Sequence, residues 1–473
     1  MNVKKIALVL LLIFAAAFVV SCGKTTTKEP AKEKDQGYSI IEPETEKKKK
    51  ISLEYLAGIP DAKPEGDFFT VATAGFDLKN DSDSVSYSNA LDERNKMVEE
   101  KFGTQLTELK CKDPETMLAD LYTSYLSGVY YSDIMVIPVS SVADFAAKGM
   151  LMNVNSLPYA DYAMEYFDAE TMKEFKIGRK VYAVSGAFNK DIGSYECLFI
   201  NRTILENCGM DVPYASVADG SWTWDKLYEI MTSVNAAQPG ISGLGYTNES
   251  EFADMVFASS GAKYLTDTDD LPKASFDRDI SSEPISLFGK LVKSGLCFSS
   301  ESSGKELAGS DVLFFVSTVD KIRDFAESET SWCILPVPKV NASQTTYCSR
   351  VSGKHPVVTI PVNNSYVEDT SYILSALNAA SYGWFDDVYY EKLIEKYIRD
   401  GDALNMLDYI CGAKGGNVSF DLAKTMSYRN REIGEYTYGV IRDSGNFGGF
   451  DGRYSSAKEM LDSIFMLYSV SVY

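Results

Sequence analysis

Histidine is almost absent from this sequence, since His355 is the only one in the chain. Imidazoles and closely spaced cysteines are the usual zinc ligands, and the sequence has no CxxC pair either, so a zinc or other imidazole-rich metal site is not expected. A Ser-His-Asp triad would have to use His355, which precedes Pro356 in an expected loop and gains no support there. We therefore expect neither a metal nor another cofactor.

Phosphate-binding loops are also missing. Neither a Walker pattern nor GxGxxG after an expected strand occurs, and the glycines of 445–450 fall between expected helices, as in a flexible loop. The adjacent carboxylates Glu99 and Glu100, like Asp386 and Asp387, would point apart on a helix. The sequence thus has no local catalytic motif, although a glycosidase whose two carboxylates lie far apart in sequence leaves no local signature and stays open.

Basic residues are outnumbered, because 46 Lys and Arg against 67 Asp and Glu give a formal net charge of -21. Nucleic acids and anionic lipid head groups would be repelled by most of such a surface. With 473 residues, 45% of them hydrophobic, the chain can bury a full core and form two lobes. The aromatic content of 12% suits sugar stacking and a large core equally, so it decides neither.

The N-terminus has two early lysines and an apolar run over 6–20 that is too short for a retained membrane span. The sequence VVSCG at 19–23 resembles a bacterial lipobox, in which Cys22 becomes the lipidated N-terminus after the signal peptide 1–21 is removed. An ordinary secretory signal and a core helix are the alternatives. The lipid would hold the protein on a membrane without a transmembrane helix.

Residues 22–64 are rich in Lys, Glu, Thr and Pro and show no apolar period before Ile51. We predict a disordered, solvated tether between the lipid and the folded body. Contact of the lysine run 47–50 with anionic head groups or wall polymers is the weaker alternative.

Strands and helices are expected to alternate three times after Asp67. The strands are at 68–74, 104–111 and 132–138, and the helices that follow them are at 88–103, 114–128 and 141–149, the second of them with Asp113 as its cap and proline at its first position. Such alternation predicts a parallel sheet with helices on its faces. Ligands of these sheets bind at the carboxyl ends of the strands, here Gly75 and Phe76 after the first strand and Pro138 with Ser140 after the third.

The stretch 195–229 predicts a buried strand, a short helix ending at Gly209 and a second helix that opens at the sequence WTWD. Thr223 has the position of an N-cap, and Trp222 and Leu227 have the spacing of a hydrophobic staple. Trp222 is therefore expected to pack at the helix entry, whereas the neighbouring tryptophan, Trp224, is open to packing or to ligand contact.

The motif FINRxILxxxG at 199–209, followed by GxWTWDxL at 220–227, resembles the second-lobe entry of bacterial extracellular solute-binding proteins of the carbohydrate, maltose-binding-protein-like type. The sequence WCILPVP at 332–338 resembles the family's WxxxPxP strand. The resemblance implies a two-lobe α/β fold of the periplasmic-binding-protein type II, in which each lobe is a mainly parallel sheet flanked by helices and a hinge joins them.

The same resemblance implies where the chain passes between the lobes. The first lobe would comprise 65–188 and 317–383, and the second lobe 189–316 and 384–473. The first crossing is expected near 185–195, and the return through the strand at 311–317, so that 332–338 would lie back in the first lobe.

Sugar recognition needs an aromatic ring against the apolar face of the pyranose and carboxylates or amides that bracket its hydroxyls. In the implied cleft, the candidates are residues at strand ends, crossings and helix starts: Phe76, Asp77, Asp133, Ser140, Phe188, Asn189, Trp224, Ser317 and Trp384. Asp133 has an equal claim to be a structural cap of its strand. Because sequence does not orient side chains, we expect fewer than half of these residues to touch ligand.

Of the eight cysteines, Cys22 is assigned to lipid, which leaves seven, and an odd number cannot all pair within one chain. Cys333 and Cys348 flank an expected strand connection and are the pair to test first. Several of the others lie in apolar contexts and are expected to be small core residues.

By this resemblance the protein is lipid-anchored on the extracytoplasmic side of the cell membrane. It would capture a carbohydrate, preferably an oligosaccharide, by hinge closure and deliver it to an ABC permease, as a monomer that does no chemistry. Nucleic acid is not expected as a partner. Two other classes stay open: a surface glycan-processing lipoprotein enzyme, and an adhesin or sensor lipoprotein without a permease.

Overall fold

The computed structural model describes residues 44–79, 84–266, 273–276, 278–300, 311–326, 330–388, 401–412, 416–419, 451–452, 454–456 and 458–459. Four predictions concern residues outside these ranges: the signal peptide, the lipidated Cys22, the first part of the tether, and the loop at 445–450.

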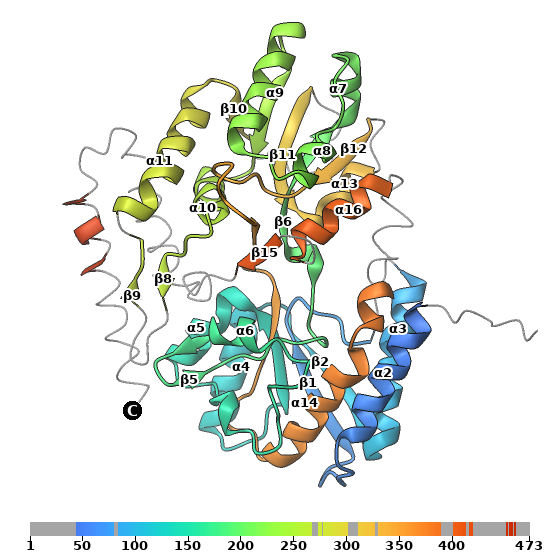
Figure 1. Cartoon of the computed structure of the whole chain (residues 1–473). Coiled ribbons are helices and arrows are strands. Elements are labelled where there is room, and N and C mark those ends of the chain that lie inside the picture. Colours follow the sequence, from blue (N-terminus) through green and yellow to red (C-terminus); the bar gives the residue numbers. More distant parts are fainter. Residues whose placement is uncertain are drawn as a thin grey trace, which may run out of the picture. The chain divides into compact units, whose positions relative to one another are not determined.

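Four strands form the first sheet, in the order β14-β3-β1-β2 (Figure 1). Strands β1 (Phe68–Thr73), β2 (Gln105–Lys110) and β3 (Ile134–Pro138) are parallel, and β14 (Pro356–Thr359) runs antiparallel to β3. The predicted parallel sheet is confirmed, and one strand from far along the chain completes it. The two middle strands, β1 and β3, contribute most of the buried side chains.

The helices of this lobe begin and end where their local sequences dictate. Helix α3 (Val85–Phe102) is capped by the Ser84 hydroxyl and ends at Gly103, whose φ of 65° favours glycine. Helix α4 (Pro114–Leu126) begins at the predicted Asp113 cap. The lobe also contains η1 (Val139–Ser141), α5 (Val142–Ala147) and α14 (Val367–Ser381).

Five strands form the second sheet, in the order β10-β7-β11-β6-β12. They are β6 (Glu196–Asn201), β7 (Ser242–Tyr246), β10 (Cys297–Ser299), β11 (Val312–Thr318) and β12 (Trp332–Leu335). Strands β10, β7 and β11 are parallel, whereas β6 runs antiparallel to β11 and β12. The longer helices near this sheet are α7 (Arg202–Asn207), α9 (Trp224–Ala237), α10 (Glu249–Ser259), α11 (Arg278–Lys293) and α16 (Gly401–Ile410).

Short elements make the connections. They are η2 (Val154–Ser156), α6 (Ala169–Lys173), β4 (Lys176–Ile177), β5 (Lys180–Val181), η3 (Ile192–Ser194), α8 (Tyr214–Ala218), β8 (Leu265–Thr266), β9 (Lys273–Ala274), η4 (Val319–Lys321), α13 (Ile322–Ala326), β13 (Tyr347–Arg350) and β15 (Gly416–Ser419). Three two-stranded sheets arise from them: β4 with β5, β8 with β9, and β13 with β15.

The entry of helix α9 has the predicted geometry. The Thr223 hydroxyl accepts a hydrogen bond from the Lys226 N–H, as an N-cap does. Trp222 is fully buried, and its indole N–H donates to the Pro336 carbonyl at 2.9 Å. The expectation that Trp222 packs at the helix entry is therefore confirmed.

The return to the first lobe comes later than predicted. The prediction that 332–338 lie in the first lobe is wrong, because β12 pairs with β6 of the second sheet, with Cys333 opposite Ile200. The chain reaches the first sheet only at β14, and therefore crosses after β13 rather than after β11. An apolar strand of four residues fits either sheet, so the sequence pattern does not identify its neighbour.

The predicted end of the first lobe at residue 383 is too early. Trp384 and Phe385 form one apolar cluster with Ala90 and Leu91 of α3. The first lobe therefore extends at least through residue 385.

The prediction of a disordered tether as far as residue 64 is wrong for its second part, because residues 44–58 form helix α2 (Glu44–Gly58). Glu and Lys favour a helix, and Ser52, Leu56 and Ile59 recur at a spacing that buries one side. The Ser52 hydroxyl donates to the Ala379 carbonyl of α14 at 2.7 Å, and α2 and α14 lie side by side in Figure 1.

The lysine run in α2 makes contacts within the protein. Lys48 pairs with Asp387 at 2.7 Å, and the Lys49 ammonium lies 5.2 Å from the centre of the Trp384 ring. The lysines therefore fasten the helix to the first lobe. Within the described ranges, no helix combines the length and apolar character needed to cross a membrane.

No disulfide joins any two of the seven cysteines in the described residues, so Cys333 and Cys348, the pair to test first, are not linked. Cys333 lies in β12 of the five-stranded sheet, whereas Cys348 lies in β13 and pairs through the backbone with β15. Two different sheets hold the two residues. Burial raises the pKa of the Cys348 thiol, as expected for a small core residue.

The docking of α2 predicts unequal effects of two substitutions in the same helix. Leu56 is 6% exposed and Leu53 is 43% exposed. Leu56→Ala should lower the free energy of unfolding by about 2 to 4 kcal/mol, because it leaves a cavity against the lobe, and the matched control Leu53→Ala should change it by less than about 0.5 kcal/mol. Urea denaturation measures both. Equal, small effects would mean that α2 is not docked in solution.

Candidate functional site

Two segments join the sheets, and we call them the crossing strands (residues 192–196 and 350–355). Tyr195 pairs antiparallel with Val351 as an isolated bridge. The N–H of Ser352 donates to the Ser194 carbonyl at 2.9 Å. The crossing strands are therefore bonded to each other between the two sheets, as a single two-stranded connection.

His355, the only histidine, lies in the second crossing strand and is buried. Its Nδ1 lies 2.7 Å from the Ser194 hydroxyl, and its ring stacks on Tyr195 at a centroid distance of 6.1 Å. Burial lowers the pKa of His355 to about 4, and nearby Asp191 and Asp168 oppose the shift only in part. At neutral pH the ring is uncharged and links the crossing strands.

A pocket of about 530 Å³ lies against the crossing strands and is lined from both lobes. Three parallel strands meet it at their carboxyl ends: β1 through Gly75 and Asp77, β7 through Tyr246, and β11 through Ser317 and Thr318. Of the strand-end residues named from the sequence, Gly75 lines the pocket, whereas Phe76, Pro138 and Ser140 are not among its lining residues. The crossing strands supply Gly193, Ser194, Glu196, Arg350, Ser352, Gly353 and Lys354, and α10 and its start supply Asn248, Glu251, Phe252 and Met255.

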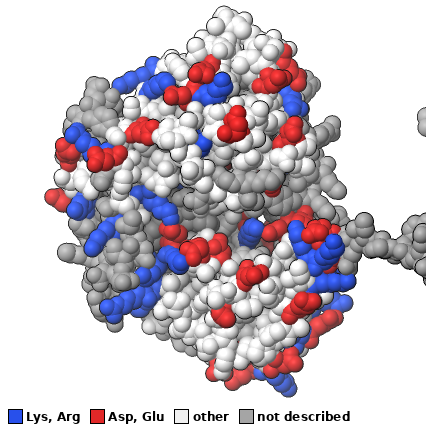
Figure 2. Space-filling view, in the orientation of Figure 1, with Lys and Arg blue, Asp and Glu red and all other residues white. Residues whose placement is uncertain are grey.

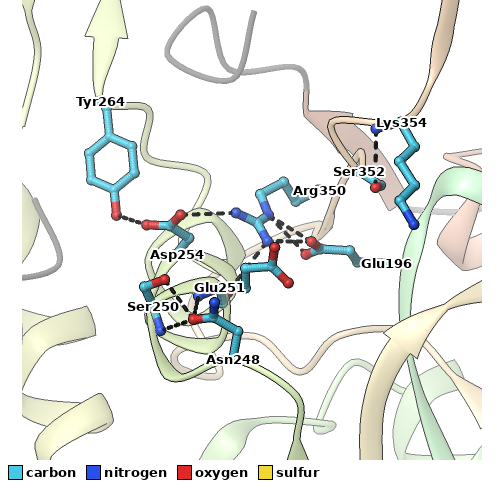
Figure 3. Close-up of polar contacts among 9 residues, drawn as sticks. All are labelled: Glu196, Asn248, Ser250, Glu251, Asp254, Tyr264, Arg350, Ser352 and Lys354. Atoms are coloured by element: carbon cyan, nitrogen blue, oxygen red, sulfur yellow. Dashed lines mark hydrogen bonds and ion pairs between the residues drawn. The ribbon is translucent and has the colours of Figure 1, made fainter. Parts of the chain in front are cut away.

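A buried charge cluster forms part of the pocket wall (Figure 3). The Arg350 Nε donates to both carboxylate oxygens of Glu196 at 2.9 Å, and Nη1 donates to Asp254 at 3.2 Å. A further bond joins Nη2 to Glu196, and Nη2 also donates to the Glu251 carbonyl at 3.4 Å. The other oxygen of Asp254 accepts from the Tyr264 hydroxyl at 2.6 Å.

The Arg350 guanidinium remains charged in spite of its burial. Removal from water would lower its pKa, but the carboxylates of Glu196 and Asp254 outweigh this effect and raise it. The side chains of Arg350, Glu196 and Asp254 are each less than a tenth exposed. The carboxyl groups of Glu196 and Asp254 thus share one guanidinium next to the pocket.

Polar groups rather than aromatic faces dominate the pocket. Glu251 is exposed on the first turn of α10, and Lys354 is exposed on the second crossing strand. The rings of Tyr246 and Phe252 stack on each other at 4.7 Å and are buried. Among the described lining residues, carboxylates, ammonium groups and hydroxyls are therefore the groups available to a ligand.

Two of the nine predicted site residues line the pocket. Asp77 follows β1 and forms an exposed ion pair with Lys110 at 2.6 Å. Ser317 lies near the end of β11 and is half-buried. Their roles as ligand contacts stay predictions.

Three predicted residues near the first crossing are held by the protein itself. Phe76 and Phe188 pack edge to face at 5.5 Å, and Phe188 also lies under the Arg94 guanidinium at 4.9 Å. Asn189 is fully buried, accepts from the Gly186 N–H at 3.2 Å and donates to the Pro356 carbonyl at 2.9 Å. These residues build the crossing, and none of them is among the lining residues of the pocket.

The predicted residues of β3 and its loop also serve the fold. Asp133 is buried and accepts from the Thr70 N–H at 2.6 Å and the Tyr130 hydroxyl at 2.5 Å, so it is the structural cap that was the alternative. Burial raises the pKa of its carboxyl. The Ser140 N–H donates to the Gly353 carbonyl at 3.1 Å, which places Ser140 behind the pocket wall.

Both predicted tryptophans are core residues. The Trp224 indole N–H donates to the Ser259 hydroxyl at 2.9 Å, and its ring packs on Phe252. The Trp384 N–H donates to the Ala380 carbonyl at 2.7 Å. Neither ring has a free face, since both side chains are at most 3% exposed.

Sequence reasoning missed Glu196, Glu251, Arg350 and Lys354. One signal was present, because Glu196 opens a strand whose next four residues are apolar, and a charge beside such a run needs a partner. The partner, Arg350, lies 154 positions away and could not be found by spacing. No three His, Cys, Asp or Glu side chains of the described part are grouped to hold a metal ion.

His355 predicts a loss of stability in mild acid. The unfolded chain takes up a proton near pH 6.5, whereas the folded chain does so only near pH 4. Stability should therefore fall as the pH drops from 6.5 to 4, by up to about 3 kcal/mol from this group. Urea denaturation at several pH values measures the slope.

The matched variant is His355→Asn, which keeps a nitrogen near Ser194 but does not titrate. The difference in unfolding free energy between wild type and variant should shrink as the pH falls through this window. A difference independent of pH would show that His355 is not buried uncharged.

Comparison by sequence gives no relatives: no protein-family model matches the chain, and no curated protein is similar to it. Comparison by structure gives many, among them three that share 11 to 14% of their residues with this chain. One is the cyclic alpha-maltosyl-1,6-maltose binding protein from Arthrobacter globiformis, with a TM-score of 0.59 and 14% identity over 84% of this chain and 98% of that one.

Two further structures agree with it. The galacto-N-biose-/lacto-N-biose I-binding protein of the ABC transporter from Bifidobacterium longum has a TM-score of 0.58 and 13% identity over 86% and 99% of the two chains. The sugar-binding protein MalE from Xanthomonas citri has a TM-score of 0.56 and 11% identity over 85% and 97%. The chain therefore has the two-lobe α/β fold of periplasmic-binding-like solute-binding proteins.

Proposed function

We propose that this protein captures a carbohydrate in the pocket beside the crossing strands and delivers it to the permease of an ABC transporter. The observation that carries the proposal is the place of the pocket, which is lined from both lobes and touches both crossing strands. A ligand held there contacts parts that move when the lobes rotate about the crossing strands, so its binding energy can favour one arrangement.

The chemistry of the lining supports a hydroxyl-rich ligand. Asp77, Glu251 and Lys354 present carboxylate and ammonium groups, which bond hydroxyls without chemical change. Solved structures of the same fold carry acarbose (TM-score 0.54, 15% identity) and cycloalternan (TM-score 0.51, 13% identity). We infer an oligosaccharide as the preferred ligand class and binding without turnover.

We further infer that Cys22 carries a lipid that holds the protein on the extracytoplasmic side of the cell membrane. The order of early lysines, apolar run and VVSCG supports it. The docking of α2 on the first lobe gives such an anchor a firm attachment, because the chain from Cys22 would end on a packed helix. The acidic and basic side chains on the face seen in Figure 2 are intermixed, so its described part offers no broad basic area to anionic lipid.

Thermal denaturation against a ligand panel tests the function. The panel contains maltotriose, acarbose, lacto-N-biose, cycloalternan and glycerophosphocholine. One sugar class should raise the melting temperature, with about 2.7 kcal/mol of stabilisation at a hundredfold excess over Kd, and chromatography should detect no product.

Glu251→Gln is the companion variant, and it should lose at least about tenfold in affinity, whereas Leu53→Ala should retain full affinity. Stabilisation by glycerophosphocholine alone would refute the carbohydrate assignment. Release of a shorter glycan would show that the protein processes glycans, and the proposal of binding without turnover would then be wrong.

Lipidation has its own test. The full-length chain, produced in a bacterial host fed an alkyne-labelled fatty acid, should carry the label and sediment with membranes, because Cys22 is the acylated residue. Cys22→Ser should lose both label and membrane association, and Cys111→Ser, the control, should keep both. Labelling of the Cys22→Ser chain would place the lipid elsewhere.

A further inference from the structure

Arg350 lies at the junction of three structural units. It ends β13 and is the first residue of the second crossing strand, and its partner Glu196 begins β6 and is the last residue of the first crossing strand. Its other partner, Asp254, belongs to α10, whose first turn lines the pocket. One guanidinium therefore connects both crossing strands to the wall against which a ligand lies.

The side chain is held by the protein at each of its guanidinium nitrogens. All three guanidinium nitrogens donate to protein oxygens: Nε and Nη2 to Glu196, Nη1 to Asp254, and Nη2 also to the Glu251 carbonyl. The residue is 5% exposed although it borders the pocket. Arg350 is thus unsuited to bind an anionic ligand directly.

The cluster also gives little stability that apolar residues could not give. Moving three charges out of water costs several kcal/mol for each, and well-packed apolar side chains often replace such clusters without loss of stability. Paired charges instead fix the relative positions of the groups that carry them, because the planar guanidinium donates hydrogen bonds to carboxylates only in set directions. The expected role of the cluster is therefore to set the position of α10 relative to the crossing strands.

We propose that Arg350 is a positioning residue that holds the α10 wall of the pocket in register with both crossing strands, and thereby sets ligand affinity and couples the ligand to the lobe movement. The inference rests on the proposed function for its ligand part only. The mechanical link between α10 and the crossing strands concerns the free protein as well.

The test compares two buried arginines. Arg350→Lys keeps the charge but loses the fork. Arg94→Lys is the matched control, because Arg94 is fully buried on α3, donates to Leu78 and Asn95, and lies outside the pocket lining. Amide hydrogen exchange is measured on both variants and the wild type without ligand.

Exchange in α10 and in the crossing strands should rise together in Arg350→Lys, at least about tenfold, while Arg94→Lys leaves both at the wild-type rate. Glu196→Gln, which keeps the shape and removes one charge, should give a smaller rise at the same two places. A rise confined to α10, or an equal rise in both arginine variants, would overturn the proposal.

The ligand arm uses the panel sugar that stabilises the wild type, measured by calorimetry. Arg350→Lys should weaken its binding at least about tenfold, and Arg94→Lys less than about twofold. Unchanged affinity in Arg350→Lys would refute the coupling to the ligand. If no panel sugar binds, the proposed function fails, and the exchange measurement still decides the role of Arg350.

Discussion

The bond between the two crossing strands is the contact on which the rest of the molecule depends. The lining residues of the pocket come from these strands, from the ends of β1, β7 and β11 in the two sheets that they join, from α10 and from the segments next to these elements. The contact is made by backbone groups at Tyr195, Val351 and Ser352 and by the side chains of Ser194 and His355. Because the two crossing strands are bonded to each other, they are expected to act together when the lobes move.

The only histidine, His355, is buried where it contacts Ser194 of the other crossing strand. A charged imidazole between the crossing strands would lose its hydration, and the Asp191 backbone and the Asp168 carboxylate offset this cost only in part. The low pKa of His355 keeps the ring neutral, so that its Nδ1 can bond Ser194 at physiological pH. The scarcity of histidine, which excludes common metal sites, thus coincides with a structural use of the single one present.

The candidate tryptophans lie in the core and not at the pocket. Trp384 is a candidate ring for sugar stacking and Trp224 is open to packing or to ligand contact by sequence, but in the structure both rings pack in the protein core. Charged side chains line the pocket instead, and the buried ones among them form the ion pairs of Arg350 with Glu196 and Asp254. Ligand recognition is therefore expected to rely on hydrogen bonds from polar side chains of the pocket. The Arg350 cluster would hold the α10 wall, which carries some of these side chains, in place before the ligand binds.

Local features were within reach of the sequence. The Asp113 and Thr223 caps, the glycine at 103 and the alternation of strand and helix depend on neighbours within a few positions, and each is found where it was expected. Helix α2 was missed because its apolar side is narrow and its stability comes from packing on α14, which the sequence does not reveal.

Sequence alone thus determined the three parallel strands of the first sheet, the Asp113 and Thr223 caps, the glycine after α3 and the resemblance that implied two lobes. Tertiary structure decided which sheet β12 joins, where the chain returns, and which polar residues face the pocket. The physical reason is distance along the chain. Strand partners and the pair Glu196 and Arg350 meet only after folding, and burial, not residue type, decides whether an Asp or Trp serves the core or a ligand.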